Sequence, residues 1–417
     1  MGELIINGGR RINGEITIQG AKNAALPILA AAVMTDEECV IKNCPALRDV
    51  DKTVLVLKDL GCGVRREGST LMINGQDMFD CKICESLMRE MRSSIIFLGA
   101  ILTRCKKASV SMPGGCPIGL RPIDLHLKAL KKLGAQISEE HGYIKCSAPK
   151  LCGCDIYLDF PSVGATENIL LASVCAEGTT VVSNAAREPE IVDLANFLNA
   201  MGAKITGAGG SVIRIDGVKR LHGAEYSVMS DRIAAATYLA AGAVTGGELT
   251  VRKANKNHMN AMLDALCDMG AELSYDGDAI HLKPIKRLKS IHTLRTMPYP
   301  GFPTDIQSPF MAAASLAKGT SVFVENIFEN RFRHVDELVR MGADIKVSGR
   351  CAVVRGVKRL SGARVRAREL RGGAALVIAG LAAEGQTIVE NTEYIDRGYE
   401  NMEKHLAACG ADIRRNN

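Results

Sequence analysis

The sequence predicts an α/β protein of two domains, each built from three copies of one repeat. A short signature recurs six times along the 417 residues: an apolar residue or cysteine, then glycine, and three residues later an apolar residue that opens a strand. Successive signature glycines are separated by 73, 68, 68, 72 and 68 residues. They are Gly61, Gly134, Gly202, Gly270, Gly342 and Gly410. A near-constant period of this length is typical of a repeated supersecondary unit.

Each copy follows the same order of elements, a βαβαββ-type repeat. An apolar helix comes first, as in residues 165–176 and 309–317. A strand follows it, and the strands predicted in this way are residues 179–183, 248–251, 321–324 and 386–389. After a loop comes an amphipathic helix, and a strand pair such as residues 203–205 and 212–215 closes the unit. Alternating helices and strands of these lengths predict a mixed α/β fold.

The amphipathic helix of the third repeat shows one apolar face. This face is formed by Ile191, Leu194, Ala195, Leu198 and Met201. The spacing of i, i+3, i+4, i+7 and i+10 is that of a helix with one buried side. The signature glycine comes directly after this helix, where we expect the left-handed conformation that ends many helices.

The repeats are also paired at a higher level, which indicates the domain boundaries. The segment 218–224 is nearly duplicated at 357–363, 139 residues later and close to two periods. The predicted N-terminal strands 4–6 and 15–18 have no helix before them, so we expect them to complete the second domain. The predicted domains are therefore residues 22–229, and residues 1–21 together with 230–417. A cleft between two such domains is the expected place for a ligand.

Composition excludes several classes of function. The net charge of +6 is spread over 52 Lys and Arg and 46 Asp and Glu, without a block of like charges, and aromatic residues make up only 4%. We therefore expect no nucleic-acid partner. The longest apolar run, residues 24–34, is too short to insert into a membrane. Fourteen cysteines without an apparent signal peptide predict a cytoplasmic protein with reduced thiols.

No metal or cofactor is predicted. The cysteine pairs 81/84 and 152/154 are not followed by a second pair at zinc-binding spacing. The chain also has no Walker loop and no strand-following Gly-x-Gly-x-x-Gly motif. The modest positive excess favours small anionic substrates. Composition and spacing leave the oligomeric state open.

The loop of residues 112–122 is the strongest single indication of chemistry. It places Cys116 and Arg121 among three prolines and several glycines, a composition that favours an exposed turn. A thiol near a guanidinium favours the thiolate, which is how a reactive cysteine is made. On the loop alone, an incidental cysteine in a turn is an equally good interpretation. His126, which follows, is interpreted as structural.

Cations recur at the predicted starts of the first helices and in the loops after the middle strands. They are Lys22, Arg92, Arg232 and Arg371 at helix starts, and Arg121, Arg187, Arg331 and Arg397 in loops. A cation at a helix start is locally unfavourable unless it shares an anionic ligand with the helix. Asp305 is a carboxylate at a helix start. It is either an ordinary N-cap or a base beside the cations.

Several segments together resemble the enolpyruvyl transferase family over essentially the whole chain. They are Gly20–Ala24, Pro113–Pro122, Ser162–Thr166, Asn184–Glu190, Pro300–Asp305, Glu325–Arg331 and Ile395–Tyr399. The resemblance implies a two-domain inside-out α/β barrel, with helices inside and sheets outside. It also implies transfer of enolpyruvate from phosphoenolpyruvate to the 3′-hydroxyl of UDP-N-acetylglucosamine, an early step of peptidoglycan synthesis.

The resemblance also implies roles for individual residues. Cys116 matches the thiol that protonates the substrate and forms a covalent adduct, Asp305 the proton acceptor, and Lys22 and Arg397 further catalytic groups. The residues implied for phosphoenolpyruvate are Lys22, Asn23, Arg92, Arg121, Arg331, Arg371 and Arg397. Those implied for UDP-N-acetylglucosamine are Asn23, Arg92, Arg121, Pro122, Ile123, Asp124, Leu125, Ser162, Val163, Gly164, Asp305 and Ile327.

Two positions depart from the family pattern, and two alternatives stay open. Phe160-Pro161 stands where some relatives have a lysine for the diphosphate, and Glu369 where an aspartate is common. The first alternative is the sister transferase of the shikimate pathway, which does not use such a cysteine loop. The second is a catalytically silent paralogue that binds the nucleotide sugar.

Overall fold

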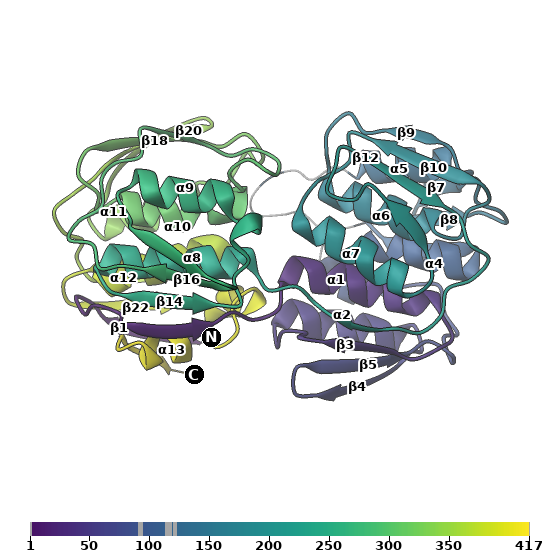
Figure 1. Ribbon diagram of the computed structural model, residues 1–417, viewed down its shortest axis with the longest axis horizontal. Coiled ribbons are helices and arrows are strands. Elements are labelled where there is room, and N and C mark those ends of the chain that lie inside the picture. The colour runs from purple at the N-terminus through teal and green to yellow at the C-terminus, as the bar shows by residue number, and fades with distance from the viewer. Residues whose placement is uncertain (1, 91–94, 113–118, 120–122, 417) are drawn as a thin grey trace. The chain divides into compact units, whose positions relative to one another are not determined.

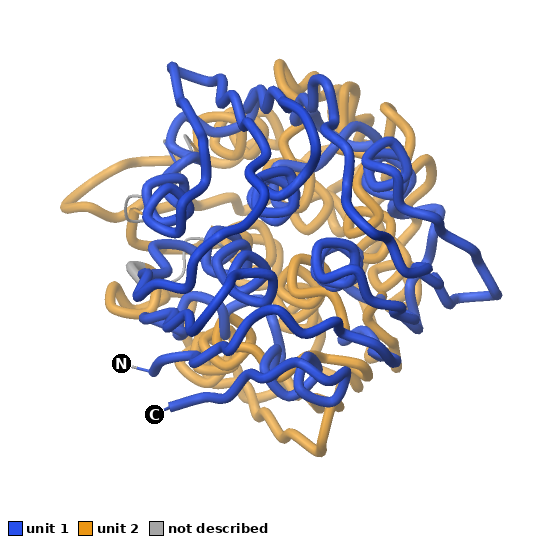
Figure 2. Tube along the Cα trace, turned by 90° about the vertical axis from the view of Figure 1, so that its left-hand side faces the viewer, with its two compact units in different colours: residues 1–19, 117–120, 230–417 blue, residues 20–116, 121–229 orange. Residues whose placement is uncertain are grey.

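The computed structural model describes residues 2–90, 95–112, 119 and 123–416 (Figure 1). These residues divide into two compact units. Unit 1 lies mainly within residues 1–19 and 230–417, and unit 2 within residues 20–116 and 121–229 (Figure 2). The first crossing thus falls two residues before the predicted boundary at Lys22. Over the described ranges there are three sheets in each unit, and the α/β fold class is confirmed.

Three nearly fully buried helices form the core of unit 1. They are α8 (Arg232–Thr245), α10 (Thr304–Ala314) and α12 (Leu370–Ala382), and they pack against one another. Their sequences are apolar on every face, which is what a helix surrounded by protein requires. Strands lie outside them (Figure 1), so this unit has helices within and sheets around them.

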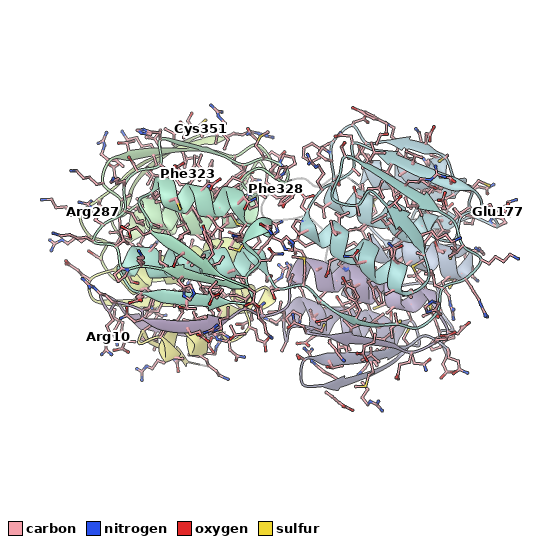
Figure 3. The ribbon with its side chains drawn as sticks, in the orientation of Figure 1. Arg10, Glu177, Arg287, Phe323, Phe328 and Cys351 are labelled. Carbon is pink, nitrogen blue, oxygen red and sulfur yellow. The ribbon has the colours of Figure 1, made fainter. Side chains whose placement is uncertain are left out.

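The sheets of unit 1 have four strands each, in the orders β15-β16-β14-β2, β17-β18-β20-β19 and β21-β22-β1-β23. The strands are β1 (Glu3–Asn7), β2 (Gly14–Thr17), β14 (Leu249–Arg252), β15 (Leu273–Asp276), β16 (Ala279–Leu282), β17 (Thr293–Arg295), β18 (Thr320–Val324), β19 (Asp344–Ser348), β20 (Cys351–Arg355), β21 (Arg364–Arg366), β22 (Gln386–Glu390) and β23 (Asp412–Asn416). Their side chains alternate between core and solvent. Phe323 on β18 is buried, whereas Cys351 on β20 is exposed (Figure 3).

The two N-terminal strands complete two different sheets of unit 1, β1 that of the last repeat and β2 that of the fourth. β1 pairs antiparallel with both β22 and β23, as β20 does with β18 and β19. β2 pairs parallel with β14, as β17 does with β18. The first strands of the chain therefore close unit 1.

Unit 2 repeats this plan with α1 (Lys22–Ala31), α4 (Phe97–Cys105) and α6 (Val163–Ser173) as its buried helices. Its sheets have the orders β13-β3-β5-β4, β11-β12-β10-β9 and β6-β8-β7. The strands are β3 (Cys39–Lys42), β4 (Gly63–Glu67), β5 (Thr70–Asn74), β6 (Lys107–Ser111), β7 (Gln136–Glu140), β8 (Tyr143–Ser147), β9 (Asp155–Tyr157), β10 (Thr179–Ser183), β11 (Lys204–Thr206), β12 (Val212–Asp216) and β13 (Glu225–Ser227).

The amphipathic helices of the repeats end as predicted. They are α2 (Arg48–Asp59), α5 (Asp124–Lys132), α7 (Pro189–Ala200), α9 (Asn260–Asp268), α11 (Val335–Arg340) and α13 (Met402–Ala408). All six signature glycines follow these helices with φ between 91° and 102°. This left-handed conformation carries no steric penalty in glycine, which explains the recurrence of the residue. The predicted apolar face of α7 is also buried.

The helix start predicted at Asp305 is confirmed, whereas the end predicted at residue 317 is three residues too late. Helix α10 begins at Thr304 and ends at Ala314, with Pro309 inside it. Proline is commonest in the first turn, because an interior proline removes a backbone hydrogen bond. The observed start places Asp305 in the first turn of α10.

The glycine that ends β12 gives a test of the fold in unit 2. A Cβ atom on Gly217 would lie 1.7 Å from the carbonyl oxygen of Ala176, so Gly217→Ala forces the backbone to move. We expect a loss of about 3 kcal/mol of stability, measured as a lower thermal unfolding midpoint. Gly63→Ala is the matched control, because its Cβ would lie 3.8 Å from Asn74. Equal midpoints for both variants would contradict the close approach.

Candidate active site

The predicted site residues fall into three groups. Arg92, Cys116, Arg121 and Pro122 lie outside the described residues. Unit 1 holds Asp305, Ile327, Arg331, Arg371 and Arg397. Unit 2 holds Lys22, Asn23, Ile123, Asp124, Leu125, Ser162, Val163 and Gly164. Each half of the candidate site is described by itself below.

In unit 1 two arginines form ion pairs with the carboxylate of Asp305. Arg331 Nη2 lies 3.0 Å from Asp305 Oδ1, and Arg371 Nη2 lies 3.0 Å from Asp305 Oδ2. Both guanidinium side chains are 2% exposed, whereas that of Asp305 is 26% exposed. The N-cap interpretation of Asp305 is wrong, because Pro303 occupies the cap position and no side chain caps α10. Asp305 is instead an oriented and partly exposed carboxylate.

Arg331 ties this carboxylate to the backbone at the start of α10. Its Nε and Nη2 donate to the carbonyl oxygen of Thr304, at 3.3 and 3.1 Å. Its Nη1 lies 3.7 Å from Glu369 Oε2. A buried guanidinium requires such compensation, since desolvation of a charge is costly. The planar fork of arginine allows it to contact both acids.

Glu369 organises the start of α12. It occupies the N-cap position, and its carboxylate accepts hydrogen bonds from the backbone N–H groups of Arg371 (2.8 Å) and Gly372. Two free N–H groups of the helix are thereby satisfied. The Glu369 side chain both caps α12 and approaches Arg331. Arg371, the second residue of α12, also lies over the ring of Tyr399, with 5.4 Å between Cζ and the ring centroid.

Glu325 is a buried residue that the sequence did not single out. It follows β18 and is 1% exposed. Its Oε1 accepts from the backbone N–H groups of Ile327 (2.9 Å) and Phe328 (3.1 Å), and its Oε2 accepts from Thr304 Oγ1 (3.0 Å). One carboxylate therefore joins the predicted nucleotide-sugar residue Ile327 to the helix start that carries Asp305. A glutamate directly after a middle strand was the available signal.

In unit 2, Lys22 has an acidic partner that the sequence analysis missed. Its Nζ lies 3.3 Å from Asp49 Oδ2, and the two side chains are 12% and 2% exposed. Lys22 is the first residue of α1, and Asp49 lies in the first turn of α2. An acid is favourable at a helix start and a cation is unfavourable. Asp49 therefore suits the start of α2 and also balances the charge of Lys22 at the start of α1. Asn23 follows Lys22 on α1 and is half-buried.

The start of α6 is built by a cap and a close approach. Ser162 Oγ accepts from the backbone N–H of Ala165 at 3.3 Å, as an N-cap serine does. A Cβ atom at Gly164 would lie 3.0 Å from His126 Cε1 on α5, so glycine is needed for this packing. His126 is buried and its Nδ1 lies 2.8 Å from Asn168 Nδ2 on α6. This position agrees with the structural interpretation of His126.

Arg187 is exposed in unit 2, unlike the buried Arg331 and Arg371 in unit 1. Its Nε donates to the carbonyl oxygen of Gly209 at 3.3 Å, in an exposed contact. The loop position after a middle strand therefore did not by itself identify a site residue. Phe160, which departs from the family pattern, is 45% exposed.

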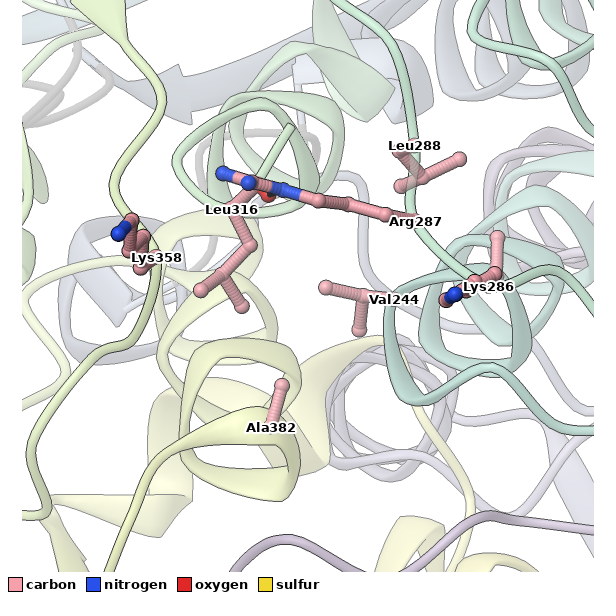
Figure 4. Close-up of a pocket in the computed structure, with 8 residues that line it drawn as sticks. Val244, Lys286, Arg287, Leu288, Leu316, Lys358 and Ala382 are labelled. Carbon is pink, nitrogen blue, oxygen red and sulfur yellow. Dashed lines mark hydrogen bonds between the residues drawn. The ribbon is translucent and has the colours of Figure 1, made fainter. Parts of the chain in front are cut away.

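A cavity of about 210 Å³ opens at the other end of the unit 1 core (Figure 4). It is lined by residues such as Val244, Leu316 and Ala382, next to the C-terminal ends of the three core helices. Arg287 donates to the carbonyl oxygen of Leu316 (3.1 Å), just beyond the end of α10, and to that of Val357 (2.9 Å), in the loop after β20. Asp305 and Arg371 lie at the opposite, N-terminal ends of these helices, so this cavity is separate from the candidate site.

Two searches of the described residues gave nothing. In this part of the chain no three His, Cys, Asp or Glu side chains are grouped so as to hold a metal ion. No helix within it combines the length and the apolar character needed to span a membrane.

Comparisons with known proteins agree on one family. The family model for EPSP synthase (3-phosphoshikimate 1-carboxyvinyltransferase) matches residues 6–406. UDP-N-acetylglucosamine 1-carboxyvinyltransferase 2 of Caldanaerobacter subterraneus subsp. tengcongensis is 55% identical over 100% of both chains. UDP-N-acetylglucosamine 1-carboxyvinyltransferase 1 of Symbiobacterium thermophilum is 52% identical, over 99% of this chain and 94% of its own.

Solved structures show the same fold. The enolpyruvyl transferase NikO from Streptomyces tendae superposes with a TM-score of 0.89, covering 99% of this chain and 98% of its own at 24% identity. An EPSP synthase from Acinetobacter baumannii gives a TM-score of 0.77 at 21% identity, covering 100% of both chains. The inside-out α/β fold implied by the resemblance is therefore confirmed as the fold of the enolpyruvyl transferases.

His334 makes the stability of unit 1 dependent on pH. It precedes α11 and is buried against the first turn of α12, and burial lowers its pKa to about 4, with Arg331 also acting in this direction and Glu369 against it. Below pH 6.5 the unfolded chain takes up a proton that the folded chain does not, so this contribution to stability is present above pH 6.5 and lost as the pH falls toward 4.

Between pH 7.5 and pH 5 we therefore expect the free energy of unfolding to fall by about 2 kcal/mol less in His334→Gln than in the parent protein. The measurement is the thermal unfolding midpoint of both proteins at the two pH values. His292→Gln, at an exposed position of the same unit, is the control and should follow the parent. An unchanged pH dependence in His334→Gln would show that His334 titrates normally in the fold.

Proposed function

The chain belongs to the enolpyruvyl transferase family, and from this premise we propose that it transfers enolpyruvate from phosphoenolpyruvate to the 3′-hydroxyl of UDP-N-acetylglucosamine and releases phosphate. The full-length identity of 55% and 52% to proteins named for this reaction supports the choice of acceptor. The observation that carries the proposal is the partly exposed carboxylate of Asp305, which Arg331 and Arg371 hold by ion pairs to both of its oxygens.

The proposed reaction is an addition followed by an elimination. The acceptor hydroxyl oxygen attacks C2 of phosphoenolpyruvate while Asp305 accepts the hydroxyl proton. Cys116 donates a proton to C3, so that the double bond becomes a single bond. In the second step C3 loses a proton, the bond from C2 to the phosphate oxygen breaks, and the double bond returns. An acid and a base are thus needed at different atoms of the substrates.

Asp305 suits the role of base because of how it is held. Its two ion pairs fix both oxygens at 3.0 Å from a guanidinium nitrogen, so the carboxylate cannot rotate away from the hydroxyl. Orientation of a catalytic group can account for a large share of a rate enhancement. Arg331 and Arg371 were predicted to bind phosphoenolpyruvate. We assign them the orientation of Asp305 as well.

The remaining cations would hold the negative charges of phosphoenolpyruvate, which carries a carboxylate and a phosphate. We assign this role to Lys22, Arg92, Arg121 and Arg397, with Asn23 beside Lys22. Arginine forks suit both groups, because they form two parallel hydrogen bonds. Preorganised cations also stabilise the charge that develops in the transition state.

We assign the nucleotide sugar to the helix starts of unit 2 and to the loop after β18. The residues assigned are Asn23, Arg92, Arg121, Pro122, Ile123, Asp124, Leu125, Ser162, Val163, Gly164, Asp305 and Ile327. Ser162 caps α6, and the N–H groups at this helix start would donate hydrogen bonds to an anionic or carbonyl oxygen of the substrate. The fixation of Ile327 by Glu325 supports a preformed contact.

The product is a precursor of peptidoglycan, so the proposed place of action is the cytoplasm and the proposed wider roles are in cell shape and division. The epoxide fosfomycin, which alkylates the thiol of this family, should modify Cys116. The proposal names no metal or cofactor, and its partners are the two small substrates.

The experiment that tests the proposed function is phosphate release from phosphoenolpyruvate with UDP-N-acetylglucosamine, and in parallel with shikimate 3-phosphate. We expect release with the nucleotide sugar only. Release with shikimate 3-phosphate only would establish the sister transferase. Release with neither, together with binding of UDP-N-acetylglucosamine by calorimetry, would establish a silent paralogue.

Asp305→Asn separates catalysis from binding. The amide keeps the size of the side chain but cannot accept the hydroxyl proton, so we expect kcat to fall by about 10² to 10⁴. Calorimetry should show UDP-N-acetylglucosamine binding within a few-fold of the parent. Asp344→Asn, which removes an exposed partner of Arg355 in the same unit, is the control and should keep full activity. A kcat near that of the parent in Asp305→Asn would remove Asp305 from the mechanism.

A further inference from the structure

Arg397 is the last residue of a short 3₁₀ turn, η4 (Thr392–Arg397), outside the sheets. A 3₁₀ turn has poorer hydrogen-bond geometry than an α-helix and is seldom long. The position of such a turn therefore depends on what its side chains and its flanks contact. Two side chains far away in the sequence, Arg415 and Gln19, hold η4 and the residues after it.

Arg415, on β23, contacts both ends of η4. Its Nη1 and Nη2 donate to the two carboxylate oxygens of Asp396, at 3.0 and 2.7 Å, in a fork. Its Nη1 also donates to Thr392 Oγ1 at 3.1 Å. Asp396 directly precedes Arg397, so this fork fixes the backbone that carries Arg397. Bidentate pairs of this kind are among the strongest hydrogen bonds in proteins.

The other edge of the same guanidinium holds the following helix. Nε and Nη2 of Arg415 donate to Oε1 and Oε2 of Glu403, both at 3.1 Å, in the first turn of α13. Burial opposes the charge on Glu403, but the hydrogen bonds from Arg415 and the backbone, together with the charges of Arg415 and Lys404, lower the pKa of the carboxyl below its ordinary value. The side chains of Arg415 and Glu403 are 22% and 10% exposed. Arg415 thus joins β23, η4 and α13.

Gln19 holds the chain on the other side of Arg397. Its Nε2 donates to the carbonyl oxygen of Gly398 at 3.2 Å, and its Oε1 accepts from the backbone N–H of Glu400 at 2.6 Å. The nitrogen and the oxygen of one side-chain amide therefore both form hydrogen bonds with the segment that follows Arg397. The residue between, Tyr399, is buried, and its hydroxyl lies 2.8 Å from Thr237 Oγ1.

The Arg415 cluster is not itself arranged to bind an anion. Its guanidinium N–H groups are directed at Asp396, Glu403 and Thr392, and the two acids outnumber the one cation. The cluster therefore acts on its neighbours in the protein. The neighbour with an assigned chemical role is Arg397.

We infer that Arg415 is a positioning residue for the transferase, which fixes η4 through Asp396 and thereby sets where Arg397 meets phosphoenolpyruvate. Gln19 supports the same segment from the opposite flank. The inference rests on the proposed function, since that function assigns Arg397 to this substrate. Displacement of a binding group by about 1 Å is enough to lose much of its effect.

Steady-state kinetics of Arg415→Gln test the inference. We expect KM for phosphoenolpyruvate to rise about tenfold, while KM for UDP-N-acetylglucosamine changes less than about twofold. Arg415→Lys keeps the charge but loses the fork, and should recover part of the loss. Arg364→Gln is the matched control, because Arg364 joins Glu3 on β1 and Glu390 on β22 at 2.6 Å, within a sheet of the same unit and not in η4 itself. It should leave both KM values unchanged. Equal rises for the two substrates in Arg415→Gln, or none, would overturn the inference.

Hydrogen–deuterium exchange of the peptide 392–400 gives a readout that does not depend on activity. In Arg415→Gln and in Gln19→Met we expect its amides to exchange faster than in the parent, and in Arg364→Gln at the parent rate. Unchanged exchange in Arg415→Gln would overturn the inference whatever the kinetics. If the parent releases no phosphate, the proposed function fails, and exchange still decides whether Arg415 fixes the turn. If Arg415→Gln does not fold, Arg415→Lys and Gln19→Met carry both measurements.

Discussion

Burial of the three core helices of unit 1 on every side is the constraint on which the rest of the site depends. Helices α8, α10 and α12 are apolar around their whole circumference, so a charged side chain can lie only at their ends. At the N-terminal ends the free N–H groups favour negative charge, yet Arg232 and Arg371 stand there. Asp231, Asp305 and Glu369 supply the acids that these ends favour. The candidate catalytic residues of unit 1 thus lie at one end of the helix bundle, while the cavity that Arg287 lines lies at the other end.

The two buried arginines make Asp305 a structural residue as well as a chemical one. Removing one partner from a buried ion pair typically costs about 3–5 kcal/mol, because a charge is left unpaired. In this cluster the cost is shared, since Arg331 also contacts the Thr304 carbonyl and Glu369. The network therefore holds the carboxylate in one orientation. Arg331 is also compensated by the Thr304 carbonyl and Glu369, and Arg371 by the ring of Tyr399. A base held in this way requires no reorganisation when the substrate binds.

Local patterns made most of the fold predictable, and long-range contacts made up most of what was missed. The period, the glycine caps and the apolar face of α7 all depend on neighbours within one repeat, and all three are confirmed. The start of α10 beside Asp305 was predicted, but its end was predicted at residue 317, three residues beyond Ala314. Cations at helix starts were read from the sequence as a shared feature. The contacts of Lys22 with Asp49, of Thr304 with Glu325 and of Asp396 with Arg415 join residues 19 to 27 positions apart, and no periodic pattern records such pairs.

The crossings between the units lie beside residues with assigned roles. The two crossing segments are joined by hydrogen bonds from the N–H of Ala21 to the carbonyl oxygen of Met229 (2.7 Å) and from the N–H of Asp231 to that of Gln19 (2.9 Å). Gln19 grips the segment after Arg397 in unit 1, and three residues later Lys22 pairs with Asp49 in unit 2. Gly20 stands between them, where a Cβ atom would lie 1.8 Å from the carbonyl oxygen of Asn43. Each side of the first crossing is therefore tied to its own unit through a residue next to the candidate site, so that the connection between the units and the anion-binding groups share the same few residues.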